Sequence, residues 1–228
     1  MLTPIEIYKK FLLKVNKNDT NANIKVPISQ FVFLFNGEKR RWLDDVTKTK
    51  ESSDYIEDIE FLLEVDVPLT RVTTTATRDD FAGPSNYFKR VSSYCLASKD
   101  KCKNVLLYNW YIKAKNLNVL LQNENQKPSF EYGETLALMN NDKVSIYKDG
   151  FSVNKVFFTY YREPADLDIA GYRKIDGSLS TNVQIDLDDI SIEEIIDRTV
   201  VEALRNYEST EQVQLALQRQ QLDEKNEK

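Results

Sequence analysis

The fold is decided by residues 144–161, which read VSIYKDGFSVNKVFFTYY. Val144 and Ile146 alternate with more polar neighbours, the period-two pattern of a half-buried β-strand. Asp149-Gly150 provides turn chemistry and joins this strand to the run 153–161. That run is apolar on both sides, as expected for a strand that is covered on both faces. The stretch therefore predicts two consecutive strands of a larger sheet.

The period of two extends outward from this stretch, from about residue 65 to about residue 175. A second alternating run contains Leu106, Tyr108, Trp110 and Ile112. Turn residues recur at 83–85, 140–142 and 176–177. Together these features predict an antiparallel β-barrel or sandwich of about six to eight strands.

Helices are predicted before this β-rich module. Thr3 can cap a helix that starts at Pro4, and Glu6 completes a Thr-x-x-Glu capping box. Residues 27–46 share an apolar helical face that includes Trp42, and the glycine within them costs about 1 kcal/mol. The alternative is a strand over 31–35 that enters an Asn-Gly hairpin turn, but no alternating strand follows it.

A third helix is predicted to start at Ser52 or Ser53. Its apolar face would consist of residues with helical spacing, namely Ile56, Ile59, Leu62 and Leu63. The fold class that follows is α+β, with residues 1–64 as an N-terminal helical part and residues 65–175 as the β-rich module. Residues 176–228 then supply C-terminal helices that complete the helical part.

The C-terminal region contains two predicted helices. Ser191 and Glu194 form a capping box for the first, and Ser209 and Gln212 form one for the second. The second helix has a thin apolar stripe on a surface rich in glutamine and glutamate, made of Val213, Leu215, Ala216, Leu217 and Leu222. So little apolar surface holds a helix weakly to its own domain. We therefore predict that the stripe contacts a neighbouring subunit, the alternative being a loosely docked terminal helix.

The composition argues against most enzyme classes. The chain has no histidine, which removes the commonest general base and metal ligand. Its six glycines form no glycine-rich phosphate loop. Cys95 is predicted to be buried and Cys102 to lie in a loop, without a catalytic base. We expect no catalytic residues, no metal and no cofactor.

An acidic set near the C-terminal helices could form a calcium site or a carboxylate pair. It consists of Asp166, Asp168, Asp176, Asp186, Asp188 and Asp189, and it lacks the spacing of a calcium-binding loop. We expect these carboxylates to cap helices and fill turns.

The charge balance bears on partners. The formal net charge is −5 and the isoelectric point is about 5.1, so the whole protein is no electrostatic binder of nucleic acid. The basic run Lys39, Arg40 and Arg41 could contact DNA phosphates or form a solvated helix face, and Lys99, Lys101 and Lys103 leave the same choice. No signal peptide is expected, and the longest apolar runs are far shorter than the ~20 residues that span a bilayer. No membrane partner is expected.

Several runs resemble those of one family of virion proteins. They are TPIEIY at 3–8, FNGEKRRW at 35–42, KPSFEY at 127–132, YYREP at 160–164 leading to Gly171-Tyr172, and IIDRTVVEALR at 195–205. Together they resemble structural proteins of crAss-like short-tailed phages. Within that set, the chain is similar to the head–tail connector, or adaptor, which forms the ring directly below the portal. The resemblance covers nearly the whole chain.

The resemblance implies an architecture and a set of partners. Terminal helices would pack together as a small bundle, with an antiparallel β-barrel or sandwich inserted between them. The implied assembly is a homo-oligomeric ring of twelve copies in the neck of the virion, built in the host cytoplasm. Its partners would be the portal protein, the next tail ring protein, and genomic DNA that passes through without sequence-specific binding. The family offers no catalytic residues to carry over.

Other functions remain open. The chain could be another tail ring or tube component of the same virion. In a different class, it could be a carbohydrate-binding β-module whose stacking platform would be Tyr87, Tyr94, Trp110 and Tyr111. An enzyme based on the carboxylates of Asp186 and Asp188 is the third hypothesis.

Overall fold

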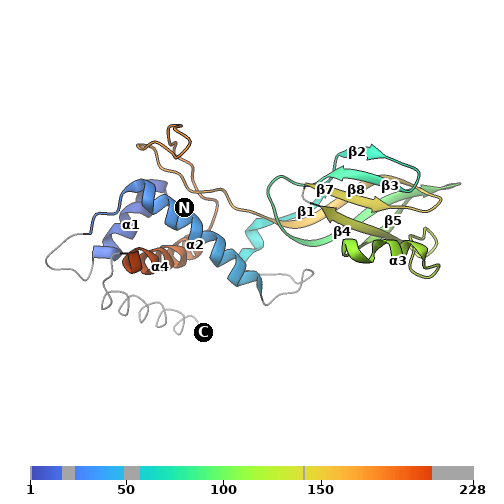
Figure 1. Cartoon of the computed structure of the whole chain (residues 1–228), viewed down its shortest axis with the longest axis horizontal. Coiled ribbons are helices and arrows are strands. Elements are labelled where there is room, and N and C mark those ends of the chain that lie inside the picture. Colours follow the sequence, from blue (N-terminus) through green and yellow to red (C-terminus); the bar gives the residue numbers. More distant parts are fainter. Residues whose placement is uncertain (1, 17–23, 49–56, 141, 207–228) are drawn as a thin grey trace. The chain divides into compact units, whose positions relative to one another are not determined.

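A computed structural model describes residues 2–16, 24–48, 57–140 and 142–206. The chain divides into two compact units (Figure 1). The helical unit comprises Met1–Thr49 and Pro164–Lys228, and the β unit comprises Lys50–Glu163. The β unit is therefore an insertion within the helical unit. Both boundaries lie earlier in the chain than the sequence analysis placed them.

The helical unit contains α1 (Pro4–Asn16), α2 (Ile28–Lys48) and α4 (Asp189–Asn206), and α4 contacts both α1 and α2. Helix α1 begins as predicted, because the Glu6 carboxylate accepts a hydrogen bond from the backbone N–H of Thr3 at 2.8 Å. The prediction of a helix over 27–46 is confirmed by α2. Trp42 is buried in it and donates its indole N–H to Glu194 on α4 at 2.8 Å.

Aromatic side chains form the contact between α1 and α2. Phe11, Phe31 and Phe35 are fully buried. The rings of Phe11 and Phe31 lie 4.7 Å apart, a distance typical of favourable aromatic pairs. The apolar faces that the sequence spacing predicted for these helices are therefore the faces that meet.

Two helix predictions are corrected. The carboxylate of Asp188, not the Ser191 side chain, caps α4, because it accepts a hydrogen bond from the Ser191 N–H at 2.7 Å. The predicted start of a helix at Ser52 or Ser53 lies outside the described residues, and the described remainder is a 3₁₀ segment at Glu57–Leu62, after which Leu63 pairs with Tyr161 in the sheet. Non-helical dihedral angles at Ile59 (φ −127°, ψ 24°) interrupt the expected helix. The helix predicted after Ser209 lies outside the described residues.

The β unit is one eight-stranded sheet with the order β1-β8-β4-β5-β6-β7-β3-β2. Its strands are β1 (Leu63–Pro68), β2 (Arg71–Thr74), β3 (Arg78–Ala82), β4 (Tyr87–Lys99), β5 (Cys102–Tyr111), β6 (Glu134–Asn140), β7 (Lys143–Tyr147) and β8 (Ser152–Arg162). Strands β5 and β6 pair parallel, joined by a connection that contains α3 (Leu117–Gln122). The α+β class is confirmed, and the other strand pairs are antiparallel as predicted.

The sheet curls into a half-barrel, which corrects the expectation of a closed barrel or a two-sheet sandwich. The segment between its edge strands β1 and β2 bridges the two sides. The Leu69 N–H donates to Val156 on β8 at 2.9 Å, and Thr70 accepts from the Ala82 N–H on β3 at 2.8 Å. Asp149-Gly150 joins β7 and β8 as predicted. In the strand order, however, these two strands are not neighbours. Gly150 adopts a φ of +69°, which suits glycine.

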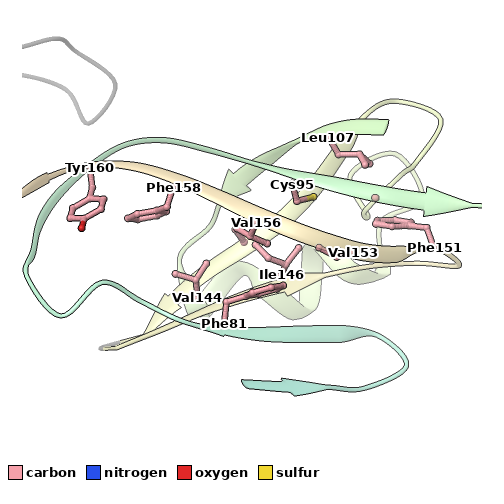
Figure 2. Close-up of a cluster of buried hydrophobic side chains, with 12 residues drawn as sticks. Phe81, Cys95, Leu107, Val144, Ile146, Phe151, Val153, Val156, Phe158 and Tyr160 are labelled. Atoms are coloured by element: carbon pink, nitrogen blue, oxygen red, sulfur yellow. The ribbon is translucent and has the colours of Figure 1, made fainter. Parts of the chain in front are cut away.

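The core of the β unit lies on the inner face of this curled sheet (Figure 2). Strands β3 to β8 all contribute buried side chains to it, including Phe81, Val144, Val156 and Phe158. Cys95 is part of this core, and burial raises the pKa of its thiol to about 12. Cys95 is buried as predicted, but Cys102, which was predicted to lie in a loop, is the exposed first residue of β5. The Cys95 thiol is therefore a packing group.

Among the described residues, no helix is both long and apolar enough to cross a membrane.

Candidate interaction surface

An open groove runs along α1 and is lined mainly by apolar side chains. It encloses about 1320 Å³ and is formed by α1, the segment that leads to α2, and Glu193. We call it the α1 groove; its apolar lining is Tyr8, Leu12, Leu13, Ile24, Val26 and Pro27, and its basic lining is Lys9, Lys10, Lys14 and Lys25. Leu13 is 72% exposed in it. A groove of this size and chemistry suits a peptide segment.

Helix geometry explains why α1 can line a groove and still pack on α4. Ile7, Phe11 and Val15 repeat at intervals of four and are buried. Leu13 lies off this buried stripe and remains exposed. The inner face of α1 therefore builds the unit, while its outer face presents leucine to solvent.

Polar contacts fix the other wall of the α1 groove. The Tyr8 hydroxyl donates to the Val26 carbonyl at 2.6 Å. The Asn16 side chain accepts from the Ile24 N–H at 2.7 Å and donates to the Leu12 carbonyl at 3.0 Å. These bonds hold residues 24–26 against α1, so the groove is preformed.

Ion pairs to α4 border the groove. Lys14 Nζ lies 2.6 Å from Asp197 Oδ1 and 2.8 Å from Glu193 Oε2, and Lys10 also pairs with Glu193. Burial opposes the charge on Lys14, but its bonds to Asp197 and Glu193 outweigh that and raise its pKa. Burial also opposes the charge on Glu193, which by itself would raise its pKa. Lys10 and Lys14 outweigh this effect and hold the pKa of Glu193 below its ordinary value. Lys9 and Lys25 remain exposed at the groove.

A second groove, of about 1080 Å³, runs along α2 and beside residues 166–176. We call it the α2 groove. Phe33 on α2 is 74% exposed beside it, and Ile175 is fully exposed. The lining also holds charged groups of both signs, among them Arg40, Arg41 and Glu202. The helical unit thus has apolar side chains open to solvent on two different helices.

Asp168 organises the loop beside the α2 groove. Its nearly buried carboxylate accepts hydrogen bonds from the Tyr172 hydroxyl at 2.8 Å and the Thr181 N–H at 3.1 Å, and it pairs with Lys174 at 2.8 Å. Burial raises the pKa of Asp168, but these partners outweigh it and lower that pKa. The loop that carries the exposed Ile175 is therefore built around one carboxylate.

Of the three residues in the basic run, the structure rules out Lys39 as a DNA contact. Lys39 is fully buried, and its ammonium donates to the carbonyls of Pro164 at 2.8 Å and Ala165 at 3.2 Å and to Asp166 at 2.6 Å. It ties α2 to the chain that returns from the β unit, so it is not available to a phosphate.

The two arginines of the basic run are each 64% exposed, but both lie beside carboxylates. Arg40 lies 3.6 Å from Asp166, and Arg41 pairs with Glu38 and lies 3.9 Å from Glu202. They form a helix face with compensated charge.

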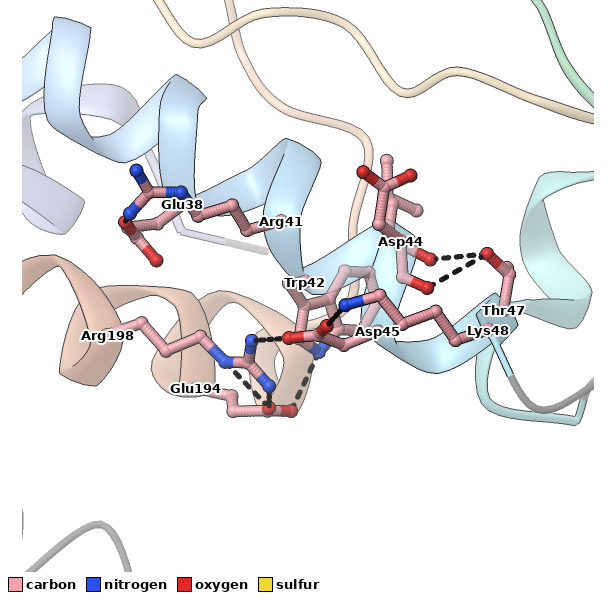
Figure 3. Close-up of polar contacts among 10 residues, drawn as sticks. Glu38, Arg41, Trp42, Asp44, Asp45, Thr47, Lys48, Glu194 and Arg198 are labelled. Carbon is pink, nitrogen blue, oxygen red and sulfur yellow. Dashed lines mark hydrogen bonds and ion pairs between the residues drawn. The ribbon is translucent and has the colours of Figure 1, made fainter.

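A polar network joins α2 to α4 next to this run (Figure 3). Arg198 donates to Asp45 at 2.7 Å and to Glu194 at 2.9 Å, so it links the two carboxylates. Lys48 also binds Asp45, and these hydrogen bonds lower the pKa of Asp45. Burial raises the pKa of Glu38, and Arg41 opposes that rise only in part. The network holds α2 against α4. The outer faces of these helices remain open to the grooves.

The remaining predicted site residues are the C-terminal apolar stripe and the acidic set. Val213, Leu215, Ala216, Leu217 and Leu222 lie outside the described residues. In the described ranges, no group of three or more His, Cys, Asp or Glu side chains is placed to hold a metal ion. Instead, Asp188 caps α4, Asp186 accepts from the Ala165 N–H at 2.9 Å, and Asp176 accepts from the Ser178 N–H at 2.9 Å. Asp188 and Asp176 thus have the cap and turn roles that the sequence predicted, whereas Asp186 joins two segments that are far apart in the sequence.

The four aromatic residues of the predicted carbohydrate platform do not share a face. Tyr87 and Tyr111 pack against the inner core, and the Arg90 guanidinium lies 3.8 Å from the Tyr111 ring centre. Burial raises the pKa of Tyr111 to about 12. Trp110 is 59% exposed, and Tyr94 stacks on Phe157. Strand periodicity predicts this outcome, because neighbouring residues 110 and 111 point to opposite faces.

Three large side chains are exposed that the sequence analysis did not predict to be exposed. Leu13 and Phe33 lie off the buried stripes of their helices, and Tyr108 lies beside Trp110 on the outer face of β5. The available signal was a large apolar residue on the polar side of an amphipathic element. We call the exposed row Leu106, Tyr108 and Trp110 the β5 ridge.

Comparison with known proteins gives the chain no family. No protein-family model matches it, and no curated protein matches it. The function is therefore argued from the sequence runs and from the surfaces of the two units.

Proposed function

We propose that the chain is a subunit of a head–tail connector ring, which docks below the portal, extends the DNA channel and seats the tail. The sequence runs at 3–8, 35–42, 160–164 and 195–205 support this assignment, because they resemble connector proteins of crAss-like phages. Three of these runs contribute to α1, α2 and α4. The runs at 127–132 and 160–164 lie wholly or mainly in the β unit, so the resemblance extends over both units.

The observation that carries the proposal is the pair of open grooves on the helical unit. A subunit of a closed ring contacts its two neighbours through two different surfaces, and a connector must also contact a ring above and a ring below. The α1 groove and the α2 groove lie on different helices and have different linings. Such a subunit needs several unlike docking surfaces, and the helical unit has two.

The order of the elements also supports the proposal. Segments from before and after the β unit belong to one helical unit, in which α4 contacts both α1 and α2. In the proposed adaptor-like fold, these helices and the C-terminal segment form a bundle at the portal, and the β unit projects towards the tail.

Charge is consistent with a channel through which DNA slides. Each phosphate contact strengthens DNA binding, so a strongly basic lumen would hold the strand. Arg40 and Arg41 lie beside carboxylates, and the net charge is −5 per subunit. Replacing both arginines with alanine should leave DNA ejection intact. Stalled ejection would identify them as DNA contacts.

Electron microscopy tests the proposal directly. Purified full-length protein would be imaged in negative stain, alone and mixed with the portal of the same phage. The proposal predicts closed rings stacked coaxially on portals, with twelve subunits in class averages. Protein that stays monomeric and leaves the portals bare would contradict it.

One observation favours a second candidate, a carbohydrate-binding module. Tyr108 and Trp110 are exposed on the same face of β5, and exposed aromatic rings can stack on sugars. A glycan array tests this, because a carbohydrate ligand lost in the Trp110→Ala variant would support it. An alternative within the first class, another ring or tube protein of the same tail, would show rings that do not bind portals.

A further inference from the structure

We infer that the α1 groove binds residues 207–228 of a second copy of this chain. The inference rests on the proposed ring, since it names the contact between neighbouring subunits. The segment follows α4 in the sequence and contains the thin apolar stripe described above. The groove offers the apolar wall that such a stripe requires.

The chemistries of groove and segment are complementary. The α1 groove is lined by six apolar or aromatic side chains, four lysines, one asparagine and one glutamate. The segment carries Val213, Leu217 and Leu222 among glutamines, and five acidic residues against three basic ones. Lys9 is exposed at the groove, where it can meet these carboxylates. Leucines would fill the apolar part while the acidic ends pair with lysines.

The lengths also agree. Helix α1 has 13 residues and is therefore about 20 Å long. The segment has 22 residues, and the apolar stripe from Val213 to Leu222 would span about 14 Å as a helix. The stripe fits along α1 with both ends left over for a connection and for the charged terminus.

Geometry favours a second copy over the same chain. Glu193, which lines the groove, lies in the first part of α4, whereas the segment begins after Asn206. These two points are about 20 Å apart along the helix axis, so the same chain would have to reverse and run back along α4. A groove and a segment are also two different surfaces of one chain, and this kind of heterologous contact closes rings.

Cysteine cross-linking in the full-length protein tests the contact. The exposed Cys102 is first replaced with serine, so that only the buried Cys95 remains. One protein then carries Leu13→Cys and another carries Leu217→Cys, and the two are mixed and oxidised. We expect a disulfide-linked dimer at about tenfold the yield of a control mixture of Val119→Cys with Leu217→Cys, because docking raises the effective concentration. Val119 is a matched control, since it is 68% exposed on the β unit.

Each outcome decides the inference. A yield equal to that of the control overturns it and leaves the groove to another partner. A chain that carries both cysteines is the second measurement: a monomer that closes its own disulfide overturns the second copy in favour of the same chain, whereas linked multimers support the inference. Failure is distinguishable from failure of the proposed function, because portal-bound rings without the cross-link would refute only the groove contact. A cross-link without rings on portals would refute only the connector.

Discussion

The helical unit and the β unit bury their apolar side chains in different ways. In the β unit, strands β3 to β8 wrap one core on the inner face of a curled sheet. In the helical unit, polar groups tie together segments 125 to 152 positions apart, as Lys39 binds Pro164 and Trp42 binds Glu194. Its helices pack on one side and leave two grooves open on their outer faces. Under the proposed function, this difference makes the helical unit the expected source of the contacts between subunits.

Exposure alone does not make the two units equivalent as docking surfaces. Leu13 in the α1 groove and Tyr108 on the β5 ridge are exposed to similar degrees, 72% and 66%. Leu13 lies in a concave site with a preformed wall and lysines beside it. Tyr108 lies in a row of side chains on the outer face of one strand. A concave apolar surface with charged groups gives a partner both burial and orientation.

The largest expected effect is on the core of the β unit. Phe158 is fully buried in that core, so Phe158→Ala should lower the free energy of unfolding by about 3–5 kcal/mol. Trp110 lies in the β unit and Trp42 in the helical unit, so a Trp42→Phe background lets fluorescence follow β-unit unfolding in urea. Leu106→Ala on the exposed β5 ridge is the control, with an expected loss of under about 1 kcal/mol. Equal losses would mean that the inner face is not the core.

The second prediction breaks the polar tie of the helical unit. Lys39→Met keeps the aliphatic stem but leaves the carbonyls of Pro164 and Ala165 without their donor. We expect a loss of about 2–4 kcal/mol in the unfolding free energy of the helical unit, reported by Trp42 in a Trp110→Phe background. Arg40→Met is the matched control, because Arg40 is exposed, and it should cost less than about 0.5 kcal/mol. An unchanged free energy of unfolding in Lys39→Met would contradict the role of Lys39 in joining α2 to Pro164 and Ala165.

A third, smaller effect concerns pH and the border of the α1 groove. Lys10 and Lys14 hold the pKa of Glu193 below 4.5, so the stabilising pair is present above that pH and is lost as pH falls through the lowered pKa. Glu193→Gln should destabilise by about 0.5–1 kcal/mol at pH 7, and the difference from wild type should shrink as pH falls through the lowered pKa of Glu193. Urea unfolding across that pH range checks it. A difference that persists at low pH would assign the effect to packing.

The smallest effect is a gain in stability at Gly37 in α2. In the described part of the chain, a Cβ added there would meet no heavy atom within 4 Å. Gly37→Ala should stabilise the helical unit by about 0.5–1 kcal/mol through helix propensity. An increase in the melting temperature, followed by circular dichroism, would show it. Destabilisation would indicate that the α2 groove is closed by a neighbour at this position.

The sequence predicted those features that local chemistry determines. The Thr3–Glu6 capping box, the helix that contains Trp42 and the Asp149-Gly150 turn depend on neighbouring residues, and all three are present. Periodicity also gave the strand content of the β unit. Local patterns therefore sufficed for element type and for most buried faces.

Pairing and burial across long distances could not be predicted in the same way. Periodicity predicts a strand but not its neighbour, so the separation of β7 from β8 was not foreseen. It also indicated the wrong buried face for β5, where Leu106, Tyr108 and Trp110 are exposed and Leu107 is buried. Helical spacing places Lys39 on the buried face with Phe35 and Trp42, but only the return of the chain at Pro164 gives its ammonium a buried partner. Leu13 was overlooked for a related reason: the groove beside it requires residues 24–27 to lie against α1.

Sedimentation of three full-length proteins tests most directly whether the helical unit provides the contact between copies. Wild type would be compared with Leu13→Glu in the α1 groove and with Tyr108→Glu on the β5 ridge, two substitutions at exposed positions. The account predicts that wild type and Tyr108→Glu form the same oligomer, whereas Leu13→Glu shifts to monomer at the same concentration. Loss of the oligomer in Tyr108→Glu, with Leu13→Glu unchanged, would contradict it and place the contact on the β unit.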